Sequence, residues 1–138
     1  MSLGRVFVDT GAWFAIQVTD DANHEAARLV LPAVVHACRS LVTSNRIVGE
    51  TYTLLRLSRG YRAAKRFLDT LGQSGKLERL FVTEHLERQA YEILHGYADH
   101  PFSFVDATSF VAMKALGIKD AYTFDKHFAA AGFAVLPS

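Results

Sequence analysis

The chain has 138 residues, with 15 lysines and arginines, 14 aspartates and glutamates, and a formal net charge of +1. Half of the residues are hydrophobic and 21% are charged. This composition excludes a disordered chain, which needs low hydrophobicity and high net charge. No apolar run reaches the about 18 residues of a membrane-spanning helix, and a single cysteine, Cys38, excludes a disulfide framework. The near-neutral total does not suggest a nucleic-acid enzyme.

The first residues lack the charged and apolar regions of a secretory signal peptide. With a lone thiol and no export signal, we expect a cytoplasmic protein without a membrane anchor. No linker, repeat or low-complexity segment interrupts residues 1–138, so we expect a single domain. A domain of this length buries about 68–70% of its unfolded surface, and it needs no disulfide to fold.

In chain order, the first predicted strand covers residues 6–8, and Asp9-Thr10-Gly11 ends it. A helix follows through residues 26–30, for which Asp20 or Asp21 offers an N-cap. Pro32 either kinks this helix or starts a second one. The second predicted strand covers residues 41–43.

Two helices follow that strand. Ser44 or Asn45 caps the first, Gly60 breaks it, and the second covers residues 62–71. A third strand at 80–82 precedes a helix capped by Thr83. The rest of the chain is predicted to form a strongly apolar helix at 104–116 between Ser103 and Gly117, and strands at 121–124 and 134–136.

Strands that alternate with helices predict an α/β fold: a central, mostly parallel sheet of about five strands, with helices on both faces. In such sheets, functional groups lie outside the carboxyl ends of the strands. Asp9 follows the first strand and Asp125 follows the fourth, while Glu50 and Asp106 lie in the first turns of helices that begin near the same edge. Asp106 is the most unusual, because Lys114 is the only other charged residue in 102–118 and a buried carboxylate is costly.

Each acid also fits a local structural role. Ser103 and Asp106 fit a capping box. The other local roles are an N-cap for Asp9, a cap of the turn through His127 for Asp125, and an ion pair with Arg46 for Glu50. Local capping gives no reason for four acids to converge at one edge, so we favour a shared site.

Converged carboxylates repel each other, and a hard divalent cation such as Mg²⁺ or Mn²⁺ relieves that repulsion. Such an ion can activate water and stabilise charge on a phosphoryl oxygen. Metal-dependent phosphodiester hydrolysis is therefore the leading chemistry, and other phosphoryl chemistry stays open. Thr10, Thr108 and Thr123 would orient the carboxylates or a metal-bound water. The alternative for these hydroxyls is a local bond to the backbone.

The net charge divides unevenly along the chain. In residues 46–66 the only acid is Glu50, and the six basic residues are Arg46, Arg56, Arg59, Arg62, Lys65 and Arg66. This segment could hold a nucleic-acid backbone, most directly through Arg46, Arg59, Arg62, Lys65 and Arg66, or it could be a solvated helical face. His127, two residues after Asp125, could line the pocket, although a place on the surface is favoured. We expect Trp13 and Phe14 in the core or an interface.

Four motifs, in this order, resemble those of the PIN-domain nucleases. They are Val8-Asp9-Thr10-Gly11-Ala12-Trp13, the segment 43–50 that ends in Glu50, Phe104-Val105-Asp106-Ala107-Thr108-Ser109, and Thr123-Phe124-Asp125-Lys126-His127-Phe128. No single motif is very specific, but four in order at similar spacing are. Within the family, the chain most resembles the VapC-type ribonuclease toxins of toxin–antitoxin pairs.

The resemblance implies a PIN-like three-layer fold and Mg²⁺- or Mn²⁺-dependent RNA cleavage. It implies Asp9, Asp106 and Asp125 as metal ligands, with Glu50 as a ligand or as the group that positions the attacking water. It also implies a homodimer and a cognate antitoxin protein. Two alternatives stay open: a PIN-domain nuclease that processes RNA without a toxin role, and a non-catalytic receiver-like regulatory domain.

Overall fold

The computed structural model of the chain describes residues 2–137. Five parallel strands form one sheet: β1 (Leu3–Val8), β2 (Cys38–Ser44), β3 (Leu77–Leu80), β4 (Asp120–Tyr122) and β5 (Ala134–Leu136). The helices are α1 (Thr10–Gln17), α2 (His24–Ala37), α3 (Asn45–Arg59), α4 (Tyr61–Gln73), α5 (Glu84–Gly96), α6 (Phe104–Leu116) and α7 (His127–Ala130). Within the described residues, no helix has the length and apolar character needed to cross a membrane.

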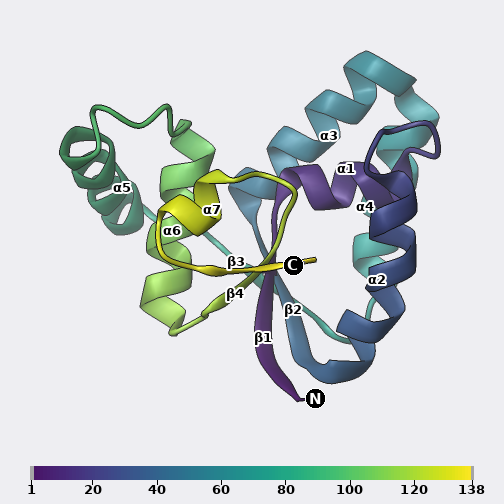
Figure 1. Cartoon of the computed structure of the whole chain (residues 1–138). Coiled ribbons are helices and arrows are strands. Elements are labelled where there is room, and N and C mark those ends of the chain that lie inside the picture. The colour runs from purple at the N-terminus through teal and green to yellow at the C-terminus, as the bar shows by residue number, and fades with distance from the viewer. Residues whose placement is uncertain (1, 138) are drawn as a thin grey trace.

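The strand order is β3-β2-β1-β4-β5, and every neighbouring pair is parallel. β1 lies at the centre, where Val6 pairs with Leu41 of β2 and Phe7 pairs with Ala121 of β4. Figure 1 shows α5 and α6 on one side of the sheet and α2 and α4 on the other. The predicted α/β fold, with a parallel sheet of five strands between two helical layers, is confirmed.

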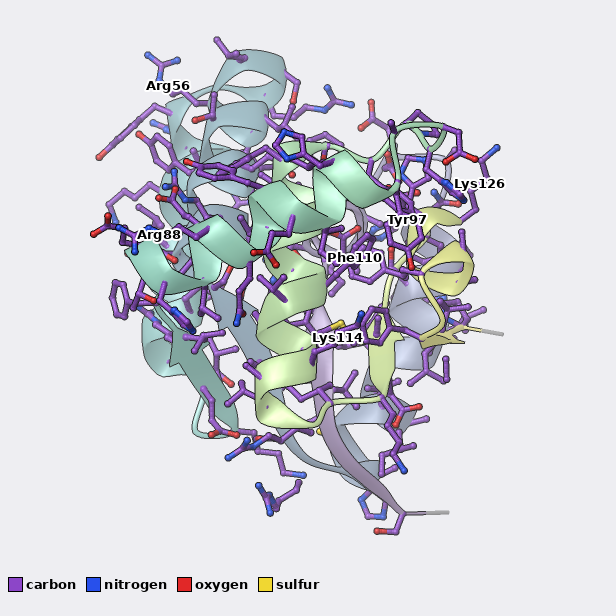
Figure 2. All side chains as sticks on the ribbon, turned by 90° about the vertical axis from the view of Figure 1, so that its left-hand side faces the viewer. Arg56, Arg88, Tyr97, Phe110, Lys114 and Lys126 are labelled. Atoms are coloured by element: carbon purple, nitrogen blue, oxygen red, sulfur yellow. The ribbon has the colours of Figure 1, made fainter. Side chains whose placement is uncertain are left out.

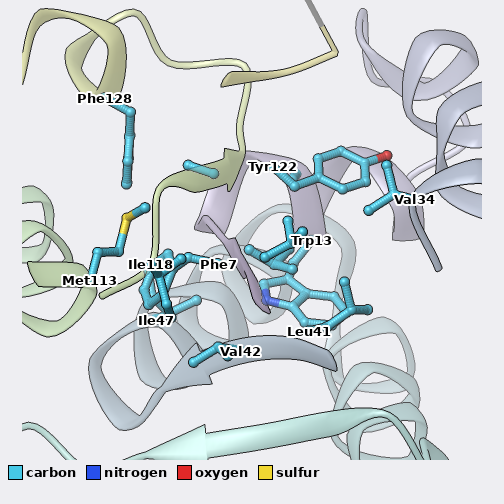
Figure 3. Packing of buried hydrophobic residues seen from close by; sticks show 14 of the residues in the cluster. Phe7, Trp13, Val34, Leu41, Val42, Ile47, Met113, Ile118, Tyr122 and Phe128 are labelled. Atoms are coloured by element: carbon cyan, nitrogen blue, oxygen red, sulfur yellow. The ribbon is translucent and has the colours of Figure 1, made fainter. Parts of the chain in front are cut away.

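The central strand explains the position of the core. Val6, Phe7 and Val8 are at most 1% exposed, because a strand covered by helices on both faces buries successive side chains. Phe7 and Val42 of the sheet lie near Trp13 and Ile47 of the flanking helices (Figure 3). This packing fixes the ends of β1, β2 and β4, and so fixes the positions of the loops that follow them.

Several helix ends follow the signals in the sequence. The hydroxyls of Ser44, Thr83 and Ser103 each accept a backbone N–H in the first turn of α3, α5 and α6. Gly60 between α3 and α4 has φ +92°, and Gly117 after α6 has φ +67°, conformations that favour glycine.

Three predictions were wrong in position. The fourth strand ends at Tyr122 rather than covering 121–124. The third strand ends at Leu80 rather than covering 80–82, and Phe81 beyond it is 68% exposed. This edge strand carries exposed Glu78 and Arg79, so its apolar signal is weak. Neither predicted aspartate caps α2, whose N-cap is Asn23.

The two aspartates make other contacts. The Asp21 carboxylate accepts the Asn23 N–H at 2.9 Å in the turn before α2, and Asp20 pairs with Arg59 at 3.1 Å. Pro32 lies inside the single helix α2, so it does not start a second helix. These differences change the entry to α2 but leave the carboxyl edge of the sheet as predicted.

Candidate functional site

A pocket of about 890 Å³ opens at the carboxyl ends of the strands. Its lining includes the four predicted acids. Asp9 follows β1, Asp125 follows β4, Glu50 projects from α3, and Asp106 lies in the first turn of α6. The strand order changes direction between β1 and β4, which is where ligands bind in open parallel sheets.

Asp9 has a buried carboxyl group with a raised pKa. It is 6% exposed, and burial is the main cause that raises the pKa of its carboxyl to about 7. A backbone hydrogen bond at Thr10 and the Thr123 hydroxyl, which donates to Oδ2 at 3.0 Å, lower the pKa. Repulsion from Asp106 and Asp125 raises it further. Asp9 occupies the N-cap position of α1, yet its side chain makes no capping bond.

Asp106 takes part in both arrangements that the sequence left open. Its Oδ2 accepts the Ser103 backbone N–H at 2.9 Å, and Ser103 Oγ accepts the Asp106 N–H at 3.0 Å, so the capping box is real. The same carboxylate is 6% exposed, lines the pocket and lies 2.9 Å from Nδ1 of His127. Capping therefore orients this acid into the pocket and does not compete with a site role.

Asp125 is held by its own loop. Its backbone N–H donates to Thr123 Oγ1 at 2.9 Å, and its Oδ1 accepts the His127 backbone N–H at 2.9 Å. The predicted turn through His127 is thus present. Because the Thr123 hydroxyl also donates to Asp9, one side chain connects two acids from neighbouring strands.

His127 lies in the pocket, which is the less favoured of the two positions that the sequence left open for it. Its side chain is 20% exposed and lines the pocket, with Nδ1 2.9 Å from Asp106 Oδ2 and 3.3 Å from Asp125 Oδ1. One potential ligand atom from each of the three lies within 4.8 Å of the others. The signal for this histidine was its position two residues after an acid at a strand end.

Glu50 enters the pocket from the α3 side and is half-buried. Its alternative partner, Arg46, instead pairs with Glu87 of α5 and lies over the Phe104 ring. The local ion pair that would have explained Glu50 is therefore absent among residues 2–137.

The three predicted threonines differ in what they contact. Thr123 bonds to Asp9, whereas the buried Thr108 hydroxyl donates to the Val105 carbonyl of its own helix at 2.8 Å. The structure thus favours the local alternative for Thr108. Thr10 Oγ1 is buried beside the pocket and has no hydrogen-bond partner in the described part of the chain.

These groups fit a divalent metal ion. The pocket gathers carboxylate oxygens, which hard cations prefer, and one of them is buried enough to resist ionisation without a positive partner. The unpartnered Thr10 hydroxyl is a further oxygen available to an ion or to its water. The site can therefore hold a cation and polarise water or a phosphoryl oxygen.

The basic segment lies on α3 and α4, which we call the α3–α4 hairpin (residues 45–73). Arg59 pairs with Asp20 at 3.1 Å and Lys65 with Asp69 at 2.7 Å. Arg62 and Arg66 are exposed and form no ion pair within residues 2–137. None of the predicted basic residues lines the pocket, whereas Lys126, which the sequence analysis did not single out, does. Figure 2 shows Lys126 beside α7, well apart from Arg56 on α3.

Apolar side chains form part of the pocket wall. Trp13 is 6% exposed and packs edge-on against Phe67, as expected for a core residue. Phe14 instead lines the pocket with Phe124, and the Arg59 guanidinium lies 5.9 Å from the Phe14 ring centre. Successive residues of a helix point in different directions, so Trp13 faces the core while Phe14 faces the pocket. The sequence alone did not distinguish the two, because both lie in one apolar run.

Residues 6–134 match the PIN domain family. The chain is 42% identical to the Mycobacterium tuberculosis protein named 23S rRNA-specific endonuclease VapC20, over 93% of this chain and 95% of that protein. It is 31% identical to an Archaeoglobus fulgidus VapC ribonuclease, over 81% of this chain and 72% of that protein.

Solved structures agree with these similarities. The crystal structure of M. tuberculosis VapC20, described as a sarcin-ricin loop cleaving toxin, superimposes with a TM-score of 0.86 at 40% identity, covering 94% of this chain and 96% of that one. Rickettsia felis VapBC2 matches with a TM-score of 0.70 at 10% identity, over 95% of this chain and 96% of that one, which is evidence for the fold alone.

Proposed function

The chain belongs to the PIN-domain family, and from this membership we propose that it is an endoribonuclease that hydrolyses RNA phosphodiester bonds with the help of Mg²⁺ or Mn²⁺. The observation that carries the proposal is the convergence of Asp9, Asp106 and Asp125, with Glu50, in one pocket of a chain 42% identical to a named rRNA endonuclease. The reaction is expected in the cytoplasm, where ribosomal RNA is found.

In this mechanism Asp9, Asp106 and Asp125 would hold the metal ion. The bound ion supplies an activated water and offsets negative charge on the phosphoryl group. Thr123 holds Asp9 Oδ2 in place, and the Ser103 N–H does the same for Asp106 Oδ2. Glu50, on the α3 side of the pocket, would orient the water that attacks the phosphorus in line.

The similarity to VapC20 also suggests a substrate and a biological role. We propose that the RNA is 23S rRNA, cut at its sarcin-ricin loop, and that the protein is the toxin of a toxin–antitoxin pair. A homodimer and an antitoxin protein belong to the same proposal. Lys126 at the pocket and the exposed Arg62 and Arg66 on the α3–α4 hairpin are suited to contact the RNA backbone.

The two alternatives are separated by different observations. A receiver-like domain has strand order 2-1-3-4-5, whereas this sheet has the order β3-β2-β1-β4-β5, so that alternative is excluded. An RNA-processing role is tested by induced expression with and without the neighbouring reading frame. A toxin arrests growth only when its partner is missing, whereas a processing enzyme gives the same growth in both cases.

The metal-site proposal is tested by two substitutions at one capping box. Asp106→Asn should abolish cleavage of a 23S rRNA fragment in Mg²⁺ or Mn²⁺, because it removes a proposed ligand. Its amide oxygen can still accept the Ser103 N–H, so folding should persist. Ser103→Ala should lose about 1 kcal/mol of unfolding free energy and retain cleavage, because it removes only the cap.

If Asp106 serves the helix alone, both variants should cleave RNA and differ from the wild type only in stability. Cleavage retained by Asp106→Asn, with only a loss of unfolding free energy of about 1 kcal/mol or less, would contradict the proposed site. Circular dichroism of both variants confirms that any loss of cleavage is not a loss of fold.

A further inference from the structure

His127 is the only histidine among the residues that line the pocket, and it is held in place from several directions. Its Nδ1 faces Asp106 Oδ2 at 2.9 Å and Asp125 Oδ1 at 3.3 Å. Its backbone N–H is fixed by Asp125 Oδ1, and its ring meets the buried Phe102 edge-on at 5.5 Å between centres. The imidazole is therefore preorganised rather than free to rotate in solvent.

The spacing of these atoms suits a shared metal ion. Neighbouring ligands on an octahedral ion with bonds of about 2.1 Å lie about 3.0 Å apart. The observed separations of 2.9 and 3.3 Å are close to that value, and the three potential ligand atoms lie within 4.8 Å of one another. With its proton on Nε2, the imidazole has a free lone pair on Nδ1, the ring nitrogen that lies next to the two carboxylates.

We infer that His127 supplies a nitrogen ligand through Nδ1, so that the site is a mixed nitrogen and oxygen site that selects Mn²⁺ over Mg²⁺. This inference rests on the proposed metal-dependent function. Mg²⁺ prefers oxygen ligands, whereas imidazole suits the transition metals, and a site with a nitrogen donor follows their order of affinity. A site of carboxylates alone would discriminate less between the two ions.

An alternative role for the imidazole in this position is to balance the charge of the two carboxylates. As an imidazolium it would neutralise Asp106 and Asp125 in the metal-free protein and then release them when the ion binds. In that case its removal changes the affinity for Mn²⁺ and Mg²⁺ by the same factor. Ligation by nitrogen instead changes the ratio of the two affinities, and this ratio is the quantity to measure.

The test uses calorimetric titration of the metal-free protein with Mn²⁺ alone and with Mg²⁺ alone. His127→Asn keeps a side-chain N–H that can reach Asp106 but offers no nitrogen ligand. We expect the Mn²⁺ affinity of this variant to fall at least about tenfold, with a smaller change for Mg²⁺. Loss of a residue that only hydrogen-bonds to a metal ligand already lowers metal affinity by about 10- to 100-fold. His85→Asn, at an exposed position on α5, is the matched control and should keep both affinities.

A second readout needs no variant. Pulsed electron paramagnetic resonance of Mn²⁺ bound to the wild-type protein should show coupling to a histidine nitrogen, and the coupling should change when histidine carries ¹⁵N. Equal loss of both affinities in His127→Asn, or Mn²⁺ without nitrogen coupling, would overturn the inference while the metal site stands. Failure of the wild-type protein to bind either ion would overturn the proposed function as well.

Discussion

The pocket and the α3–α4 hairpin carry opposite charges and hold them in different ways. Asp9 and Asp106 are each 6% exposed, and neither is paired with a lysine or arginine in the described chain. Arg62 and Arg66 on the hairpin are exposed, where water and salt screen them. The near-neutral net charge of the chain therefore hides two different groups of charges. The acids of the pocket are close together and repel one another, whereas the arginines of the hairpin are exposed to solvent.

The difference determines what a substitution in each region should do. In the pocket, charges lie close together in a poorly solvated space, so their removal should alter stability, metal affinity and cleavage together. On the hairpin, removal of a charge should leave stability unchanged and weaken only RNA association. Substitutions in the two regions should therefore differ in both the kind and the size of their effects.

The largest effect on stability should come from Asp9. Its folded pKa of about 7 exceeds the usual 3.8, so the folded protein binds this proton more tightly than the unfolded chain does. The resulting stability is fully present below pH 3.8 and is lost as pH rises through 7. For the metal-free protein, the unfolding free energy should fall over this window by up to about 1.4 kcal/mol per pH unit.

Urea unfolding at several pH values measures this slope. Asp9→Asn should flatten it, because the amide does not titrate. Asp69→Asn, at an exposed residue paired with Lys65 on the hairpin, should leave it unchanged. The same slope in Asp9→Asn and wild type would mean that Asp9 is not the buried acid responsible.

The next effect concerns two buried threonines of the same size. Thr123→Val removes the hydroxyl that donates to Asp9 and accepts from Asp125, so metal affinity should fall by about 10- to 100-fold. Thr108→Val removes a hydroxyl that bonds only within α6, so metal affinity should be unchanged. Calorimetric titration with Mn²⁺ measures the affinity of each variant. Equal losses of affinity in the two variants would show that Thr123 has no specific role in the metal site.

The smallest effect should come from the hairpin. On an Asp106→Asn background, Arg62→Ala with Arg66→Ala should reduce the salt dependence of RNA binding, with the slope falling by about one for each lost phosphate contact. Arg88→Ala, on α5, is the control (Figure 2). An unchanged salt dependence of RNA binding would show that the hairpin is only a solvated face. A loss of thermal stability in this variant would contradict the expectation that hairpin charges, unlike pocket charges, do not affect stability.

How far the sequence predicted this site depended on whether the signal was local. Asp9 and Asp125 were placed because strand ends can be read from short apolar runs, and parallel strands end at one edge. Asp106 was evident as a rare charge in an apolar helix. Its capping box was also evident, but the sequence could not show that the cap and the pocket share one carboxylate.

The features that were missed depend on distant contacts. The position of His127 in the pocket depends on its contact with Asp106, which lies 21 residues away in the chain. The residues next to His127 in the sequence predict only a turn. Arg46 pairs with Glu87, which lies 41 residues away in the chain, and not with Glu50 on its own helix. β3 was misplaced because a charged edge strand has little hydrophobic periodicity, whereas the buried β1 and β2 were unmistakable.

The most direct measurement of the central claim is the thermal unfolding of the protein with and without a divalent ion, near pH 8. An ion at about 100 times its dissociation constant should raise the unfolding free energy by about 2.7 kcal/mol, and so raise Tm by several degrees. We predict this increase for the wild-type protein with Mg²⁺ and Mn²⁺, and its loss in Asp106→Asn. An identical Tm with either ion and with a chelator would contradict the claim that the converged carboxylates form a metal site.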